Sequence, residues 1–172
     1  VSGLMVIAKN QESFFHLKRH FSQRKVYKTY SCLVYGTPPH QKELIDLPLK
    51  RSPKTGKMIT FSQKEQERGE RIKSAQTRYE AVTYFKNYTL LKLTLYTGRT
   101  HQIRVHLKSK GMPIVGDDLY TTRKAKRENQ KRGWQRLFLV ADELGFYDRA
   151  GSYREFTIEL PKELREFLYK IN

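Results

Sequence analysis

The sequence predicts an α+β domain in which helices flank a mixed, mainly antiparallel sheet. Two observations support this class. Several runs of strand length, two of them joined as a hairpin, are interspersed with a few segments whose apolar residues repeat at helical spacing. The 172 residues are 38% hydrophobic and 12% aromatic, which is enough to build one packed core and argues against a disordered chain. We therefore treat residues 1–172 as one domain.

The N-terminal part is predicted to contain a short strand, a helix and a long strand. Gly3–Ala8 is an apolar run of strand length, and Asn10 provides an N-cap for an amphipathic helix that continues to Arg24. The apolar side of this helix carries Phe14, Leu17 and Phe21. Tyr27–Tyr35 alternates strictly, as a half-buried strand does. One face of that strand carries Lys28, Tyr30, Cys32 and Val34.

The middle of the chain is less regular. Residues 37–74 are polar and interrupted by proline and glycine, which predicts an excursion with a mobile tip and a weak strand near Met58–Phe61. Thr77–Phe85 and Tyr88–Thr97 are then expected to form a hairpin through a two-residue turn.

The C-terminal part mixes helices and strands. Thr100 is expected to cap a short helix that closes near Gly111. The charged segment Arg123–Arg136 is either a helix or a disordered loop. The remaining predicted elements are strands at Leu137–Ala141 and Tyr153–Leu160 and a terminal helix that starts at Pro161.

The charge balance predicts a polyanionic partner. Lys and Arg number 34 against 17 Asp and Glu, which leaves a net charge of +17. The basic residues cluster at His16–Lys28, at Arg99–Lys110 and at Thr121–Arg136. Nucleic acid is the commonest polyanion in a cell, so we favour it over an anionic membrane or a surface that is basic only for solubility. Composition does not distinguish RNA from DNA.

Several classes of protein are excluded or disfavoured. The single cysteine, Cys32, rules out an internal disulfide and a cysteine-cluster metal site. No apolar run approaches the roughly 18 residues that span a bilayer, and no signal peptide opens the sequence, so we expect a cytoplasmic protein. His16 and His20 are one helical turn apart but have no evident third ligand, and no glycine-rich phosphate loop occurs. We expect neither metal nor cofactor.

The densest group of reactive side chains lies in Thr97–Leu107. If this segment is helical, Ile103 points inward, whereas His101 and Arg104 share a neighbouring face. An arginine at the start of a helix can pair with two oxygens of a carboxylate or phosphate. A capped amphipathic helix with a solvated basic face explains the same residues, and local sequence does not separate the two interpretations.

Two further features admit more than one interpretation. Tyr30 can stack on a nucleobase, although a core position is the commoner role of a tyrosine in a strand. Asp117 and Asp118 resemble a pair of carboxylates for acid–base catalysis or Mg²⁺ binding. A turn after Gly116, in which an aspartate bonds its own backbone, explains them more simply.

Taken together, these segments resemble the RluA-type pseudouridine synthases. Lys28-x-Tyr30-x-Cys32-x-Val34-x-Gly36 is similar to the family's K-x-Y-x-A-x-V-x-G strand. The family's longest signature is matched by GRTHQIRVHL at 98–107 and by Gly111-x-Pro113-Ile114-x-Gly116-Asp117-x-x-Tyr120. Val1–Lys9 resembles the stretch after the family's H-R-L-D catalytic loop, and Leu137-Phe138-Leu139-x-Ala141 follows in the expected order. The resemblance covers essentially the whole chain.

The resemblance implies isomerisation of uridine to pseudouridine in rRNA or tRNA, on a nucleotide flipped out of its stack and without metal or cofactor. It implies that Tyr30 stacks on the uracil and can assist its deprotonation, and that Arg104 pairs with the catalytic aspartate. Leu137 or Leu139 supplies an apolar wall of the pocket. The further candidates for substrate contact are Lys28, His101 and, for a phosphate, Arg99. RNA is the expected partner, and the protein is expected to be a monomer.

The sequence departs from the family at one point. By the family's spacing the catalytic aspartate stands three residues before Val1, so the 172 residues do not contain it. We expect a catalytic domain truncated at its N-terminus, with natural loss of activity as the alternative, and Asp117 belongs to the G-D turn of the pattern. Two functions remain in competition, an RNA pseudouridine synthase and a non-catalytic RNA-binding protein on the same scaffold. A DNA-binding module lacks any recognition-helix signature.

Overall fold

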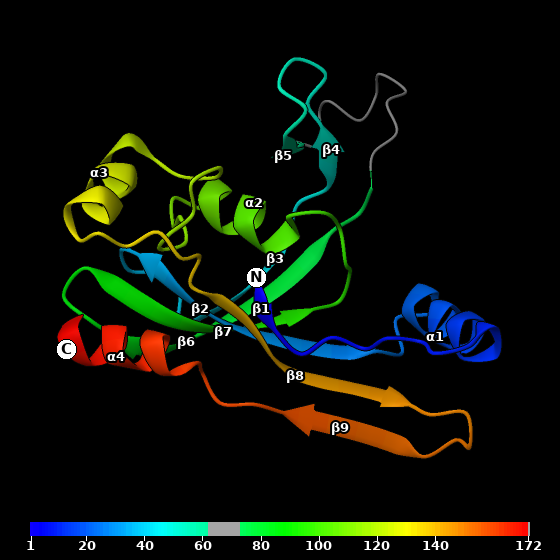
Figure 1. The fold of residues 1–172 in the computed structure, drawn as a ribbon. Coiled ribbons are helices and arrows are strands. Elements are labelled where there is room, and N and C mark those ends of the chain that lie inside the picture. The colour runs from blue at the N-terminus through cyan, green and yellow to red at the C-terminus, as the bar shows by residue number, and fades with distance from the viewer. Residues whose placement is uncertain (62–72, 172) are drawn as a thin grey trace.

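The structure is a computed structural model that describes residues 1–61 and 73–171. In this part of the chain a seven-stranded sheet has the order β1-β8-β2-β7-β6-β3, and β9 pairs with β8 beside β1 (Figure 1). Only the β1–β8 pair of these described strands is parallel. A separate hairpin, β4–β5, stands away from the sheet. The predicted α+β class with a mainly antiparallel sheet is confirmed.

The bounds of the elements are as follows. The strands are β1 (Ser2–Gly3), β2 (Tyr27–Tyr35), β3 (Lys42–Asp46), β4 (Leu49–Arg51), β5 (Met58–Thr60), β6 (Gln76–Tyr84), β7 (Tyr88–Leu95), β8 (Leu139–Tyr147) and β9 (Tyr153–Thr157). The helices are α1 (Gln11–Ser22), α2 (Gln102–Ser109), α3 (Arg123–Lys131) and α4 (Lys162–Ile171). No helix in the described ranges is long and apolar enough to cross a membrane.

The central strands form as the alternation predicts. β2 spans the predicted residues and pairs with β7 on one side and β8 on the other. β6 and β7 form the predicted hairpin, in which Phe85 N donates to Tyr88 O at 2.9 Å. Directly opposed residues of antiparallel strands share a face, so Tyr30, Leu93 and Tyr79 lie on one face of the sheet.

The two faces of the sheet are covered by different helices. α2 covers the face of Tyr30, because His106 and Gln102 of this helix contact Thr77 on that face of β6. α4 covers part of the opposite face, where the Phe167 ring lies 6.3 Å from the ring of Tyr88. Leu164 and Phe167 are buried, as the terminal-helix prediction required.

Several predicted elements differ in extent. The strand expected at Gly3–Ala8 is limited to β1, since the chain leaves the sheet after Leu4 N donates to Ala141 O. Residues 37–74 contribute more than the single weak strand: β5 confirms that strand, but β3 forms an edge of the main sheet and β4 completes a hairpin. Residues 62–72 of this excursion, and any mobile tip among them, lie outside the described residues. Arg123–Arg136 is helical over α3, with Thr122 as its N-cap.

Two helix predictions are partly wrong. Asn10 does cap α1, accepting from Ser13 N at 2.9 Å, but the helix ends at Ser22 and its predicted apolar side is not buried. Phe14 is 52% exposed and Phe21 42% exposed, because α1 lies at one end of the sheet rather than across it (Figure 1).

The cap predicted for α2 is also wrong. His101, not Thr100, is the N-cap residue, with φ at 55° in the left-handed region and no side-chain cap. The amide of Arg99 is instead satisfied by the side chain of Gln102, whose Oε1 accepts it at 3.0 Å.

Gln102 joins the loop before α2 to the sheet. It is 2% exposed and makes four side-chain hydrogen bonds. Its Oε1 accepts from Thr97 Oγ1 at 2.8 Å and from Arg99 N, and its Nε2 donates to Gln76 O and Thr77 Oγ1, both at 3.0 Å. Buried polar groups of this kind stabilise a fold only while all of them are paired. The position of the loop therefore depends on this one side chain.

We expect Gln102→Ala to lower the free energy of unfolding by about 2–3 kcal/mol, because it leaves buried donors and acceptors unpaired. Urea denaturation followed by circular dichroism measures the change. The control is Gln130→Ala on the exposed side of α3, which should change stability by less than about 0.5 kcal/mol. Equal stability of the two variants would contradict the role assigned to Gln102.

Candidate active site

Tyr30 lies in a pocket on the face of the sheet that α2 covers. The pocket has a volume of about 180 Å³ and is also lined by Lys28, Ala141, Phe21 and residues 4–6. The Tyr30 side chain is half-buried, and burial raises the pKa of its hydroxyl. Within the described residues this hydroxyl has no hydrogen-bond partner. A tyrosine ring with an unpaired hydroxyl in a small pocket can stack on a planar ligand and still bond to it.

Lys28 connects this pocket to the loop before α2. Its Nζ lies 5.4 Å from the centre of the Phe21 ring, and burial lowers its pKa. The same Nζ would lie 3.7 Å from a Cβ added at Gly98. The first residue of the GRTHQIR segment therefore lies beside the Lys28 ammonium group.

A β-bulge lies directly beside Tyr30. Thr29 pairs with Glu143 and Tyr30 with Ala141, so Asp142 is an extra residue in β8. A bulge bends its strand and redirects the neighbouring side chains, and bulges are common next to active sites. This bulge could not be seen in the sequence, because it depends on the register between two strands.

Polar side chains stabilise the bulge from the opposite face. Lys92 Nζ of β7 lies 3.0 Å from Asp142 Oδ2 and 2.9 Å from Glu143 Oε1. Ser31 Oγ donates to Asp142 Oδ2 at 2.6 Å, and Thr29 Oγ1 is 3.0 Å from both carboxylates. The backbone that carries Tyr30 is therefore fixed by contacts across three strands.

Arg104 of α2 forms a two-pronged ion pair with Asp117. Arg104 Nε lies 2.7 Å from Asp117 Oδ2 and Nη2 lies 2.7 Å from Oδ1. Burial alone would raise the pKa of Asp117, but the guanidinium and the amides of Leu119 and Tyr120 lower it below its ordinary value. Nη1 of Arg104 has no acceptor among the described residues. One edge of the guanidinium is therefore available to a second anion.

The turn interpretation of Asp117 is confirmed. Asp117 Oδ1 accepts from Leu119 N at 2.9 Å and from Tyr120 N at 2.7 Å, which closes a turn through the aspartate's own backbone. Gly116 precedes it with φ at +76°, and a Cβ there would lie 1.8 Å from Arg136 O. Asp118 is almost fully exposed, with its carboxylate 3.5 Å from Arg104, so the two aspartates do not form a catalytic pair.

His101 and Tyr120 extend this cluster. Tyr120 Oη accepts from Met58 N at 3.0 Å, and His101 Nδ1 lies 3.0 Å from the same oxygen. Burial and the neighbouring Arg104 lower the pKa of His101, so its imidazole is neutral at pH 7 and shares a hydrogen bond with the Tyr120 hydroxyl. The guanidinium carbon of Arg104 lies 5.0 Å from the centre of the Tyr120 ring.

The other candidates are placed differently. Leu139 is 2% exposed inside the core and Leu137 is half-buried, and neither lines the Tyr30 pocket. Arg99 is half-buried, and its Nε donates to Ser74 O at 3.1 Å. The Tyr30 pocket is not lined by Arg104, so Tyr30 and Lys28 form one group and His101 and Arg104 another.

The histidines of α1 do not form a metal centre in the part of the chain that is described. His16 Nε2 contacts Tyr147 O at 2.8 Å, and the two imidazole rings pack 4.1 Å apart. No group of three or more His, Cys, Asp or Glu side chains in these residues could hold a metal ion.

Comparison with known proteins decides the family. Residues 1–109 match the model of the RNA pseudouridylate synthase family. The chain belongs to this family. It is 36% identical over 171 residues to an uncharacterized RNA pseudouridine synthase of Chloroflexus aurantiacus, and 35% identical over 174 residues to ribosomal large subunit pseudouridine synthase D of Zymomonas mobilis. These matches cover 99% of this chain and 50% and 52% of the relatives, so the chain spans about half of their length.

A solved structure shows the same fold. Human RNA pseudouridylate synthase domain containing 4 superposes with a TM-score of 0.77 at 22% identity, over 97% of this chain and 70% of its own. The signature of the pseudouridylate synthase family is now located in space. Its inward residues, Gln102 and His106, hold α2 on the sheet, and its outward residues, Arg99, His101 and Arg104, face solvent-accessible space. The outward residues and the buried Ile103 were predicted from the sequence, whereas the buried polar residues Gln102 and His106 were not.

The partner of Arg104 is a new finding. The resemblance assigned this arginine to an aspartate before Val1, and the structure pairs it with Asp117. The two assignments are compatible, because the Asp117 carboxylate occupies Nε and Nη2 and leaves Nη1 unpaired among the described residues.

We expect Arg104→Ala to lower the free energy of unfolding by about 3–5 kcal/mol, because it leaves the fully buried Asp117 carboxylate without its cation. The pKa of Asp117 is depressed in the folded protein, so this contribution is present above the ordinary value of 3.8 and is lost as the pH falls through the folded pKa. Urea denaturation between pH 3 and pH 7 should show the gap to wild type closing at the acid end. Arg78→Ala, at an exposed arginine, is the control. A gap independent of pH would contradict the assignment.

Proposed function

We propose that the protein containing this chain isomerises uridines of large-subunit rRNA to pseudouridine. The observation that carries the proposal is the Tyr30 pocket, in which a half-buried ring with an unpaired hydroxyl lies beside Lys28. Family membership supports it, as does the similarity to ribosomal large subunit pseudouridine synthases D and C. The net charge of +17 fits an RNA partner. We further propose that the protein acts as a monomer in the cytoplasm.

The reaction breaks the bond between N1 of uracil and C1′ of ribose and forms a bond between C5 and C1′. The proton on C5 is lost and N1 gains one, so no other reactant is consumed. In this proposal the target base leaves its stack and packs against the Tyr30 ring, which offsets part of the cost of unstacking. Because burial raises the pKa of Tyr30, its phenol is neutral at pH 7. It therefore acts as a stacking surface and hydrogen-bonding group, not as a standing phenolate base.

Arg104 has the second role. The catalytic carboxylate that the family resemblance requires is not among the 172 residues. The unpaired Nη1 of Arg104 offers it a hydrogen bond, while Asp117 holds the guanidinium in place. Arg104 is thus proposed to orient that carboxylate toward the ribose.

The net charge of +17, which fits an RNA partner whether or not chemistry takes place, favours a second candidate function, an RNA-binding protein on the same scaffold. The residues encoded upstream of Val1 separate the two. An H-R-L-D sequence with its aspartate three residues before Val1 supports the enzyme, and another residue at that position excludes the proposed chemistry.

We expect Tyr30→Phe in the intact protein to slow pseudouridine formation by about 10²-fold or more while leaving the Kd for RNA within about twofold, because only the hydroxyl is removed. Product is measured by mass spectrometry of digested transcripts of large-subunit rRNA. Tyr84→Phe, at an exposed tyrosine, is the matched control. Wild-type rates for Tyr30→Phe would exclude a chemical role for the hydroxyl.

A further inference from the structure

A basic pocket lies beside the start of the GRTHQIR segment, between the β4–β5 hairpin and the loop before α2. Its volume is about 310 Å³. Four of the residues that line it are cations, and none is acidic. These cations are Lys50, Arg51, Lys73 and Arg99. No role has been assigned above to three of them, and Arg99 was only a candidate for a phosphate contact.

The backbone around the pocket holds these cations in place. Arg51 Nη1 donates to Gly56 O at 2.9 Å inside the hairpin, and Arg99 Nε donates to Ser74 O at 3.1 Å. Each guanidinium is thus fixed at one nitrogen and keeps further N–H groups for a ligand. Lys73 is fixed through its backbone, which exchanges hydrogen bonds of 3.0 and 3.3 Å with Leu49. An arginine held in this way is suited to bind two oxygens of a phosphate group.

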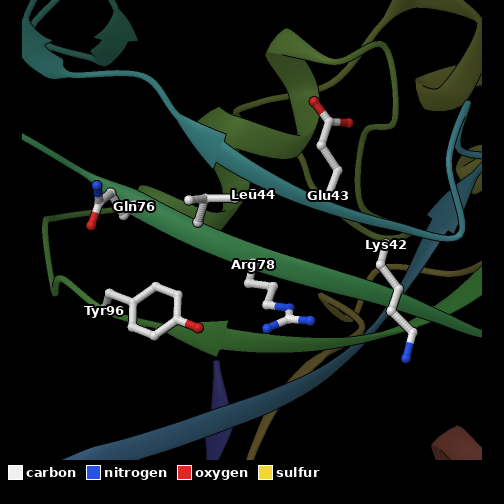
Figure 2. A pocket seen from close by; sticks show the side chains of 6 residues that line it. All are labelled: Lys42, Glu43, Leu44, Gln76, Arg78 and Tyr96. Atoms are coloured by element: carbon white, nitrogen blue, oxygen red, sulfur yellow. The ribbon is translucent and has the colours of Figure 1, made fainter.

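Among the described residues no carboxylate pairs with Arg51, Lys73 or Arg99, so these three charges are not balanced within the pocket. Like charges around one cavity repel each other, and a bound anion relieves that repulsion. A groove on the opposite face of the sheet provides the contrast (Figure 2). Its lining carries Lys42 and Arg78 together with the acidic Glu43, and Lys42 Nζ is already paired with Glu80 at 2.8 Å. The groove in Figure 2 therefore attracts an anion less strongly than the basic pocket does.

The basic pocket is next to the Tyr30 pocket. Gly98 lines the basic pocket, and Lys28 Nζ lies 3.7 Å from the Cβ position of Gly98. Lys28 in turn lines the Tyr30 pocket. An RNA strand whose base occupies the Tyr30 pocket would therefore carry its sugar–phosphate backbone past the basic pocket.

We propose that the basic pocket binds a backbone phosphate of the RNA, next to the nucleotide held at Tyr30. The ligands are the free N–H groups of Arg51 and Arg99 and the ammonium group of Lys73. This inference rests on the proposed function, because it places the bound strand by its base at Tyr30. The ligand class is a phosphodiester of a single-stranded RNA segment, recognised without reading its sequence.

The test is the salt dependence of RNA binding by the intact protein. The probe is a fluorescein-labelled RNA hairpin with uridines in its loop, and Kd is measured by fluorescence anisotropy from 50 to 300 mM KCl. Each lost phosphate contact should lower the slope of log Kd against log salt by about 0.7–0.9. We expect Lys73→Gln/Arg99→Gln to lose about two such contacts and to bind more weakly at every salt concentration.

The control carries the same change of charge elsewhere. Lys162→Gln/Arg78→Gln removes one exposed lysine on α4 and one exposed arginine on the opposite face of the sheet, and should keep the wild-type slope. The single variant Lys73→Gln, in which only a surface ammonium is removed, guards against misfolding of the double variant. A wild-type slope for Lys73→Gln/Arg99→Gln, or an equal loss in the control, would overturn the proposal.

The outcome is separable from that of the proposed function. If the basic pocket binds no phosphate but the protein is the proposed enzyme, wild type forms pseudouridine and the double variant keeps the wild-type slope of log Kd against log salt. If the enzyme proposal is wrong, wild type forms no product, and a changed slope in the double variant still identifies the phosphate site.

Discussion

The attachment of α2 to the sheet is the constraint on which the functional face depends. Gln102 and His106 are both buried and both contact Thr77 of β6. His106 Nε2 also lies 2.8 Å from Leu47 O, and burial lowers its pKa, so the ring is neutral and donates to that carbonyl. One helix is thereby bound at once to β6, to the segment after β3 and to the loop before it. Arg104 and His101 acquire their positions from this arrangement.

The same helix explains how one short segment serves both folding and chemistry. With 3.6 residues per turn, positions 102, 103, 106 and 107 face the sheet and positions 101 and 104 face outward. The inward positions hold amide, imidazole and aliphatic groups that are all satisfied or buried. The outward positions hold an arginine whose charge is only partly committed to Asp117. The division follows from helix geometry, and it puts a reactive cation on a rigid support.

The sequence predicted the elements whose patterns are strong and local. Strict alternation located β2 and the β6–β7 hairpin, and a single asparagine located the start of α1. The short edge strand β3 was missed because its five residues include three charged ones, which resemble a loop. Thr100 was assigned a cap because its side chain is suitable, but the neighbouring Gln102 already satisfies the amide that needed one.

The candidate site was predictable in part. The types and spacing of residues identified Tyr30 and Arg104, and the resemblance gave them roles. Three features depend on contacts between residues that are not neighbours in the sequence, so no local pattern encodes them. They are the Arg104–Asp117 ion pair, the basic pocket and the ion pair of Lys92 with Asp142. The burial of Leu139 and the partial exposure of Leu137 likewise depend on how the core packs.

The bulge at Asp142 has a consequence for how this chain tolerates changes in length. The bulge absorbs Asp142, so Glu143 and Leu144 still lie opposite Thr29 and Lys28. The side chains of Asp142 and Glu143 lie on one face, where both reach Thr29 and Lys92. Loss of one residue here would keep Leu144 opposite Lys28 but would remove one of the two carboxylates that hold Lys92. A change of length in the turn of the β4–β5 hairpin would instead displace Gly56 O, which holds the Arg51 guanidinium. The length of β8 beside Tyr30 therefore governs its charge rather than its register.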